Sequence, residues 1–146
     1  MGKYVQKTLM LDEKVIYDTR LHWIIYVPVG LELAMAAIVG AAGGTPIAAL
    51  LVVVAVSHFL AVTIRRATSE FAVTDKKVII KAGWLSVRTI EINRAKIESV
   101  DVTQGLVGRL VGCGNITVVG TGATREPFRD IEKPLEFRRA VQSITS

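Results

Sequence analysis

Two ionisable residues, Glu32 and His58, lie within otherwise apolar stretches of the sequence. Between Arg20 and Arg65 there is no Lys or Arg, and Glu32 is the only acidic residue. A charge at the centre of a bilayer costs about 2.5–3.5 kcal/mol, so two ionisable groups at comparable depth are expected to face each other and share a proton or a hydrogen bond. One interpretation is a proton-sensing or transport element. The other, an interhelical or intersubunit clamp, is favoured because two helices alone cannot enclose a path.

A second candidate group consists of basic residues in the C-terminal half of the chain. Guanidinium forks and ammonium point charges bind anionic headgroups, so a basic rim beside a bilayer could hold lipid. The alternative is an ordinary solvated surface, which is favoured over a specific headgroup pocket because isolated charges on turns are common. The residues of this basic rim are Lys76, Lys77, Lys81, Arg88, Arg94 and Lys96.

Catalytic chemistry is not indicated by the remaining polar residues. Ser86, Ser99 and Thr103 have no general base nearby in the sequence, and acid–base catalysis needs positioned titratable groups. The single cysteine, Cys113, excludes an intrachain disulfide, and no metal-ligand spacing is present. We therefore expect no enzymatic activity, no metal and no cofactor, and we expect Cys113 to be a buried or half-buried thiol.

The glycine-rich segment Gly105–Gly114 superficially resembles a phosphate-binding loop. It lacks the Gly-Lys-Ser/Thr ending of such a loop, and no parallel βαβ unit follows it. We predict instead a short helical turn over Leu106–Val111, with glycines where side chains would clash. Arg109 is then expected to form a surface ion pair.

The apolar stretches themselves predict two membrane-spanning helices, 22–42 and 46–64, joined by the turn Gly43-Gly44-Thr45-Pro46. About 20 apolar residues cross a hydrocarbon core of roughly 30 Å. Neither stretch has a polar stripe, and the chain is too short to bury two such helices inside a soluble core.

Basic residues flank this hairpin on its outer sides, with Lys14 and Arg20 before it and Arg65 and Arg66 after it. The turn between the helices carries no charge. Because basic residues mark the cytoplasmic side of short loops, both termini are expected in the cytoplasm of a cell whose plasma (inner) membrane holds the protein.

Beyond Arg66 the pattern changes to period-two alternation bounded by Gly, Asp and Asn, which predicts half-buried antiparallel strands. The alternating apolar pairs are Phe71/Val73, Val78/Ile80, Leu85/Val87, Val100/Val102 and Ile116/Val118. Pro134 then opens an amphipathic helix whose apolar residues recur at helical spacing up to Ile144. The segment Lys14–Arg20 is expected to add an edge strand or to lie along the membrane surface, with the edge strand preferred. These elements predict an α+β fold with a small sandwich or barrel.

The net charge of +5 arises from residues 65–146, which hold 14 Lys and Arg against 9 Asp and Glu. A basic domain beside a bilayer is attracted to anionic headgroups. The basic residues are scattered along the segment rather than clustered, so nucleic acid is not expected as a partner.

Four segments in order resemble the bacterial PH-like domain. They are Glu70–Ile79 with its Val-Thr-Asp turn, Lys81–Leu85, Ile97–Val102, and Gln104–Ile116 with the pattern Q-x-x-x-G-R-x-x-G-x-G-x-I. The resemblance covers about Glu70 to Ile144 and implies a strongly bent antiparallel sheet capped by a C-terminal helix. A two-helix hairpin before this domain is typical of small membrane members of the family. The resemblance implies no established enzymatic activity.

The sequence thus predicts a cytoplasmic arm (1–21), a membrane hairpin (22–64) and a PH-like domain (65–146). We expect a non-enzymatic scaffold or protein-interaction platform, with membrane lipids, a second copy of the chain and another membrane protein as partners. The alternatives are an oligomeric proton-linked transporter or channel using Glu32 and His58, and a domain that senses anionic lipids. Small residues that permit close helix contacts are Gly30, Ala34, Ala37, Gly40 and Ala41.

Overall fold

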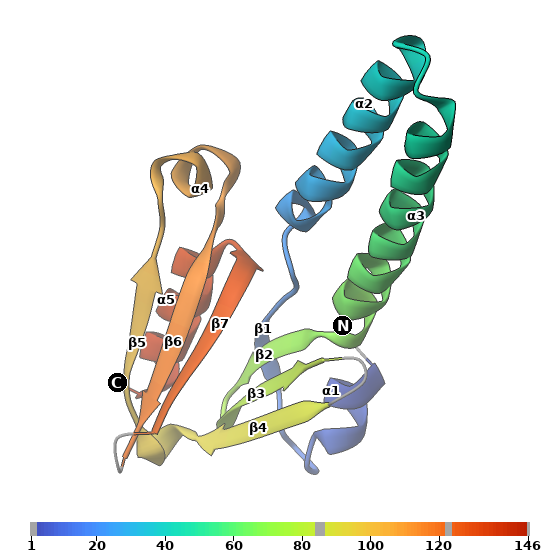
Figure 1. Ribbon diagram of the computed structural model, residues 1–146. Helices are drawn as coiled ribbons and strands as arrows, with labels where there is room; N and C mark the ends of the chain where they lie inside the picture. Colours follow the sequence, from blue (N-terminus) through green and yellow to red (C-terminus); the bar gives the residue numbers. More distant parts are fainter. Residues whose placement is uncertain (1–2, 84–86, 122–123, 146) are drawn as a thin grey trace. The chain divides into compact units, whose positions relative to one another are not determined.

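The computed structural model describes residues 3–83, 87–121 and 124–145 (Figure 1). Two compact units divide the chain. One combines the residues up to His22 with those from Thr68 onward and is called the β unit below; the other is the helical unit Trp23–Ala67. The predicted α+β class is confirmed, because two antiparallel sheets and a C-terminal helix accompany two long apolar helices.

The helical unit contains the 3₁₀ helix η1 (Trp23–Tyr26), α2 (Val27–Ala41) and nearly all of α3 (Thr45–Thr68). By length and composition, two segments could cross a membrane: Trp23–Ala41, with a mean hydropathy of 2.0, and α3, with 2.6. Only 17% and 11% of these apolar windows are buried within the chain. The two helices are therefore not core helices of the β unit.

Apart from a shift of one residue on each side of the turn, the observed helices differ from the predicted spans 22–42 and 46–64 at three places. Pro28 lies in the first turn of α2, and because proline lacks an N–H and clashes with the preceding turn, the segment before Val27 is a separate 3₁₀ helix. His22 belongs to the β unit, where it is buried and its N–H donates to the Asp130 carbonyl at 2.7 Å. α3 continues past Ile64 to Thr68, since the basic residues there are good helix formers.

The first sheet has the strand order β1-β2-β3-β4 and is antiparallel throughout. Its strands are β1 (Val15–Thr19), β2 (Glu70–Thr74), β3 (Lys77–Ala82) and β4 (Arg88–Asn93). The edge strand predicted within Lys14–Arg20 is confirmed, because Thr19 pairs with Phe71 of β2. Of the predicted alternation Leu85/Val87, residues 84–86 lie outside the described part of the chain.

The second sheet has the order β5-β6-β7 and follows the first after the 3₁₀ helix η2 (Arg94–Lys96). It comprises β5 (Ile97–Thr103), β6 (Cys113–Gly120) and β7 (Thr124–Glu132), with α4 (Leu106–Val111) between β5 and β6. In the described residues no ladder joins β4 to β5, so the two sheets do not close into a barrel. β7 was not predicted from the sequence. Its pairing with β6 has an irregular register at Gly114 and Ile116, and this irregularity breaks the apolar–polar alternation of the strand.

The main core lies between the sheets and the closing helix α5 (Pro134–Thr145), which contacts strands of both sheets. Phe71 from the first sheet meets Phe128 from the second edge-to-face, with ring centroids 5.7 Å apart. Phe137 and Val141 of α5 are almost completely buried. The predicted amphipathic helix is therefore confirmed.

A short N-terminal helix, α1 (Lys3–Thr8), covers the opposite face of the first sheet. Val5 of α1 is 1% exposed and packs with Ala72 and Ile79. β2 and β3 are consequently buried on both faces, which corrects the half-buried prediction for these two strands. Six residues are too few to show a helical period in the sequence, so α1 was not predicted.

Candidate functional site

The predicted basic rim includes a lysine that the structure places inside the β unit. Lys77 is 8% exposed, and its ammonium donates to Glu91 Oε2 at 2.8 Å and to the Thr8 carbonyl at 3.2 Å. Glu13 Oε2 lies 3.8 Å from the same ammonium. The other Glu13 oxygen, Oε1, lies 2.6 Å from the hydroxyl of the buried Thr74. We call Glu13, Thr74, Lys77 and Glu91 the buried polar cluster.

This cluster explains the Val-Thr-Asp turn in structural terms. Thr74 Oγ1 accepts the N–H of Lys77 at 3.0 Å, which closes the turn between β2 and β3. Asp75 Oδ1 accepts the N–H of Lys14 at 3.0 Å, and the N–H of Asp75 donates to the Lys14 carbonyl at 3.1 Å. The turn therefore fastens the N-terminal arm to the sheet. Lys77 is not available as a headgroup ligand in this arrangement, contrary to the sequence expectation, because a buried ammonium must stay with its carboxylates.

The other five basic residues of the predicted rim lie at the two ends of the β3–β4 strand pair. Arg94 donates its N–H to the Lys76 carbonyl at 3.0 Å, and Lys96 follows on the same 3₁₀ helix. At the other end, Arg88 pairs with Ala82, next to Lys81. The Lys81 ammonium lies 4.8 Å from the centroid of the Tyr4 ring.

Five strand residues separate the two ends, a distance of about 16 Å. The basic residues therefore do not converge on one headgroup, and a lipid-binding role for them stays a prediction.

The glycine-rich segment forms the predicted short helix, α4, and two of its glycines, Gly108 and Gly114, stand where side chains would clash. A Cβ on Gly108 would lie 2.5 Å from the Cys113 carbonyl oxygen, and one on Gly114 would lie 2.6 Å from Gln104 Cγ. Gly112 ends the helix in the left-handed region, with φ of +76°. Among the residues that the structure describes, no carboxylate lies within ion-pair distance of Arg109, so the predicted ion pair is absent there.

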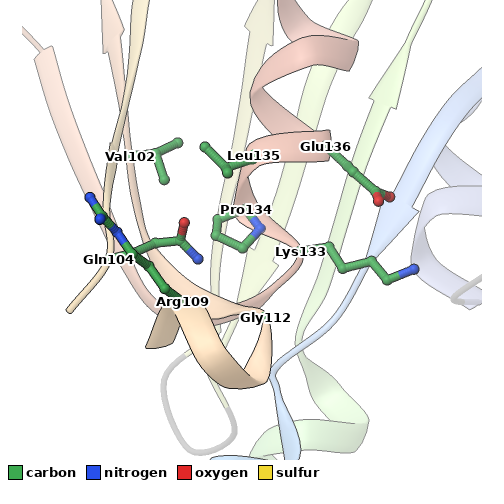
Figure 2. Close-up of a pocket in the computed structure, with 8 residues that line it drawn as sticks. All are labelled: Val102, Gln104, Arg109, Gly112, Lys133, Pro134, Leu135 and Glu136. Atoms are coloured by element: carbon green, nitrogen blue, oxygen red, sulfur yellow. The ribbon is translucent and has the colours of Figure 1, made fainter. Parts of the chain in front are cut away.

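An open groove of about 490 Å³ lies between α4, the end of β5 and the start of α5. Figure 2 shows Pro134 and Leu135 at its centre, while the charged ends of Arg109 and Lys133 extend to opposite sides. Gln104 donates its amide N–H to the Cys113 carbonyl at 2.9 Å. The groove offers an apolar floor with separated cations, and these charged groups do not converge as a catalytic site requires. This groove had no signal in the sequence, because its residues come from three elements and the loops beside them.

Within the helical unit the structure brings Glu32 and His58 together. His58 Nδ1 and Glu32 Oε1 are 2.9 Å apart, and the side chains are 37% and 28% exposed, respectively. Glu32 Oε2 is buried and has no hydrogen-bond partner in the part of the chain described. The contact supports the prediction that the two residues face each other, whereas its role as clamp or proton site stays open.

Two further titratable groups in the β unit have altered acidity. Cys113 is a free, buried thiol, as predicted, and burial together with the nearby Asp130 carboxylate raises its pKa. Burial and the Glu136 carboxylate raise the pKa of Tyr17 to about 12. The Tyr17 hydroxyl donates to Glu136 Oε2 at 3.4 Å. Both shifts favour the neutral form, which suits structural positions rather than nucleophiles.

Sequence reasoning missed the acidic partners that fix the N-terminal arm. Glu70 accepts the N–H groups of Tyr4 and Val5 at 3.1 and 3.0 Å and so begins α1. Glu13 and Glu91 neutralise Lys77. A Glu on one strand and a Lys on the strand beside it are a weak signal for an ion pair. That signal can be recognised only once the register of the two strands is known.

Comparison with known proteins gives one family match. The family model described as bacterial PH domain matches residues 26–145, which include the helical unit from Tyr26 onward and the part of the β unit that runs from Thr68 to the end of α5. No match was found among curated proteins or among solved structures.

Proposed function

The chain belongs to the bacterial PH domain family, and from this premise we propose that it is a non-enzymatic, membrane-anchored interaction module. In this proposal α2 and α3 cross the membrane twice, and the β unit serves as a scaffold for copies of the chain and for a partner protein. The buried polar cluster supports it, because several of the polar groups that could do chemistry in the β unit already serve the fold.

The observation that carries the proposal is a face of small residues on α2 that α3 leaves uncovered. Gly30, Ala34, Ala37 and Ala41 recur at spacings of four, three and four, and all four are exposed. Gly40 instead approaches α3, with its Cβ position 3.4 Å from Ala48 Cβ. Small residues let helices approach closely in a membrane, where packing rather than water drives association. We propose that this face joins α2 helices of two or more copies.

The test is the oligomeric state of the full chain in lipid nanodiscs or native membranes. Replacing Ala37 with Leu, alone or with Ala34→Leu, should shift cross-linked oligomers toward monomer by roughly tenfold, as a clash of about 1.4 kcal/mol implies. The matched control is Val54→Leu on the exposed surface of α3, which should leave the oligomer unchanged. A monomeric parent protein, or an equal response of both variants, would reject the helix-packing proposal.

The open edges of β4 and β5 support the platform role. In the described residues each of these strands pairs on one side only. An extended segment of another protein can add to such an edge. A photoreactive amino acid at the exposed Thr89 of β4 should capture a defined partner, whereas the same group at Arg138 on the exposed face of α5 should not. Equal capture from both positions would argue against the edge as the binding surface.

The proposed topology places both termini in the cytoplasm, with the Gly43–Pro46 turn on the other side. The basic flanks Arg20, Arg65 and Arg66 support this orientation. A membrane-impermeant label should modify a cysteine introduced at Gly43 in intact cells, and should reach one at the exposed Glu98 only after the cells are opened. The reverse pattern would overturn the orientation.

A second candidate function, proton-linked transport by an oligomer, is favoured by the Glu32–His58 contact and the unpartnered Glu32 Oε2. Replacing Glu32 with Gln keeps the size of the side chain and removes its charge. If the parent protein carries a proton flux in reconstituted vesicles, this variant should lose it while retaining its fold. No flux in the parent, or an unchanged flux in the variant, ends this alternative.

A further inference from the structure

Among the described residues of the β unit, the short helix α4 carries three exposed apolar side chains. Leu106, Val107 and Leu110 are 82%, 61% and 88% exposed, and Arg109 is the only charged residue of this helix. We infer that α4 is a third membrane contact, whose apolar side chains enter the interfacial layer of the bilayer while Arg109 meets headgroup phosphates. This inference rests on the proposed function, since it takes α2 and α3 as the anchor in the same bilayer.

α4 is held rigidly in its exposed position. A six-residue helix is marginal in water, so its environment must stabilise it. Gln104 donates to the Cys113 carbonyl, and Gly108 allows α4 to approach the same carbonyl more closely than any side chain would permit. The Gly112 carbonyl accepts the N–H of Lys133 at 2.8 Å, which ties the end of α4 to the start of α5. The segment therefore presents leucines to its surroundings on a fixed support rather than on a loose loop.

Hydrogen bonds within the β unit place α4 at the end of the sheet from which the chain enters the first apolar helix. Cys113, two residues after the end of α4, pairs with Glu132 of β7, whose N–H donates to the Arg20 carbonyl at 3.0 Å. Leu21 then bridges to Ile131, and His22 is followed by the first residue of the helical unit. Two interstrand spacings, about 10 Å, separate the base of α4 from this exit.

The second connection to the helical unit returns at the same end. α3 ends at Thr68, and β2 begins at Glu70, whose neighbour Phe71 pairs with Thr19. The opposite end of the β6–β7 hairpin, at Gly120 and Thr124, lies about 20 Å farther along the strands. Among the ends of the second sheet, the end that bears α4 is therefore the one tethered next to the membrane.

The bilayer fits this surface better than a protein partner does. A stable protein interface buries about 800 Å² on each side, more than three side chains of one short helix can supply. Membrane insertion needs only a few apolar groups and benefits from nearby basic residues. Charges around α4 are mixed: Arg109 and Lys133 are basic, Glu132 lies 4.0 Å from Arg20, and Glu136 faces Tyr17. Arg109 alone projects from α4 itself, which suits a phosphate contact at the base of inserted leucines.

The test uses the full chain reconstituted into vesicles of phosphatidylglycerol and phosphatidylethanolamine. An environment-sensitive fluorescent amino acid replaces Leu110 in one variant and Leu106 in a second, and the matched control carries it at Thr121, at the opposite end of the second sheet. Spin-labelled lipid with a shallow quencher should reduce the emission at Leu110 and Leu106 at least about twofold more than at Thr121. Aqueous iodide should show the opposite order. Since both leucines are highly exposed, the replacements do not disturb the core.

The outcomes separate the inference from the function on which it rests. If the protein does not remain in vesicles after an alkaline wash, membrane anchoring itself fails. If it remains and the probes on α4 are quenched by iodide as strongly as the probe at Thr121, only the α4 contact is rejected. Protection of the α4 probes from both quenchers would also reject it, because a protein partner rather than lipid would then cover the helix.

Discussion

Replacing Lys77 with Met tests the most constrained part of the β unit. The Glu13 side chain is 0% exposed, whereas that of Glu91 is 35% exposed and can turn toward water once the ammonium is gone. Glu13 would keep its contact with Thr74 and the N–H of Met10 at 2.9 Å, but its charge would be buried without a cation. Breaking a buried pair in this way costs about 3–5 kcal/mol, and the two remaining hydrogen bonds place the expected loss near the lower value.

Hydrogen exchange of the full chain in nanodiscs is the appropriate assay, because it reports opening of the β unit separately from the apolar helices. A loss of about 3 kcal/mol should make amides of β2 and β3 exchange roughly a hundredfold faster. Amides of α2 and α3 should be unaffected. The neighbouring exposed Lys76 provides the control, since Lys76→Met should change stability by less than about 0.5 kcal/mol.

A double variant identifies the cause of the loss. Adding Glu13→Gln to Lys77→Met removes the stranded charge and should restore most of the protection. If the double variant exchanges as fast as Lys77→Met alone, the loss arises from the missing bond to Thr8 or from packing. If Lys77→Met behaves like Lys76→Met, the buried ion pair does not hold the N-terminal arm to the sheet.

Three further predictions follow from individual positions. Gly108→Ala should destabilise the β unit by about 1–3 kcal/mol, because the added Cβ would meet the backbone. Gly105→Ala should be close to neutral, because no atom lies within 4 Å of its Cβ position. Thermal unfolding of the two variants measures the difference. Cys113 should react slowly with a thiol reagent near neutral pH because its pKa is raised; a rate like that of a free thiol would contradict its burial. Tyr17 should ionise near pH 12 in an ultraviolet titration, and since its folded pKa lies above the ordinary value of 10, stability should be complete below pH 10 and decline as the pH rises toward 12. Tyr17→Phe should remove the part of the stability loss above pH 10 that comes from ionisation of Tyr17. An unchanged dependence of stability on pH would refute this prediction.

The sequence by itself determined the elements whose signal is local. Apolar stretches of about 20 residues with at most one acidic residue and no Lys or Arg indicate membrane-length helices because the hydrocarbon core disfavours charge. The alternation at Val100 and Val102, and the helical spacing after Pro134, indicate elements with one buried face. The clash-avoiding glycines of the α4 segment could also be predicted, since short turns constrain the backbone directly. The facing of Glu32 and His58 was predicted from their comparable distances to the turn.

Only the tertiary structure decided which groups are buried together. α1 covers the first sheet through residues about 65 positions apart, so the burial of β2 on both faces has no local signature. Lys77 follows a polar turn and resembles a surface lysine in sequence, yet Glu13 and Glu91 reach it from distant segments and make it an internal cation. The position of α4 at the end of the sheet from which the chain enters the helical unit likewise depends on pairings between β6, β7 and Leu21. Burial and electrostatic pairing are properties of neighbours in space, and the fold, not sequence separation, selects those neighbours.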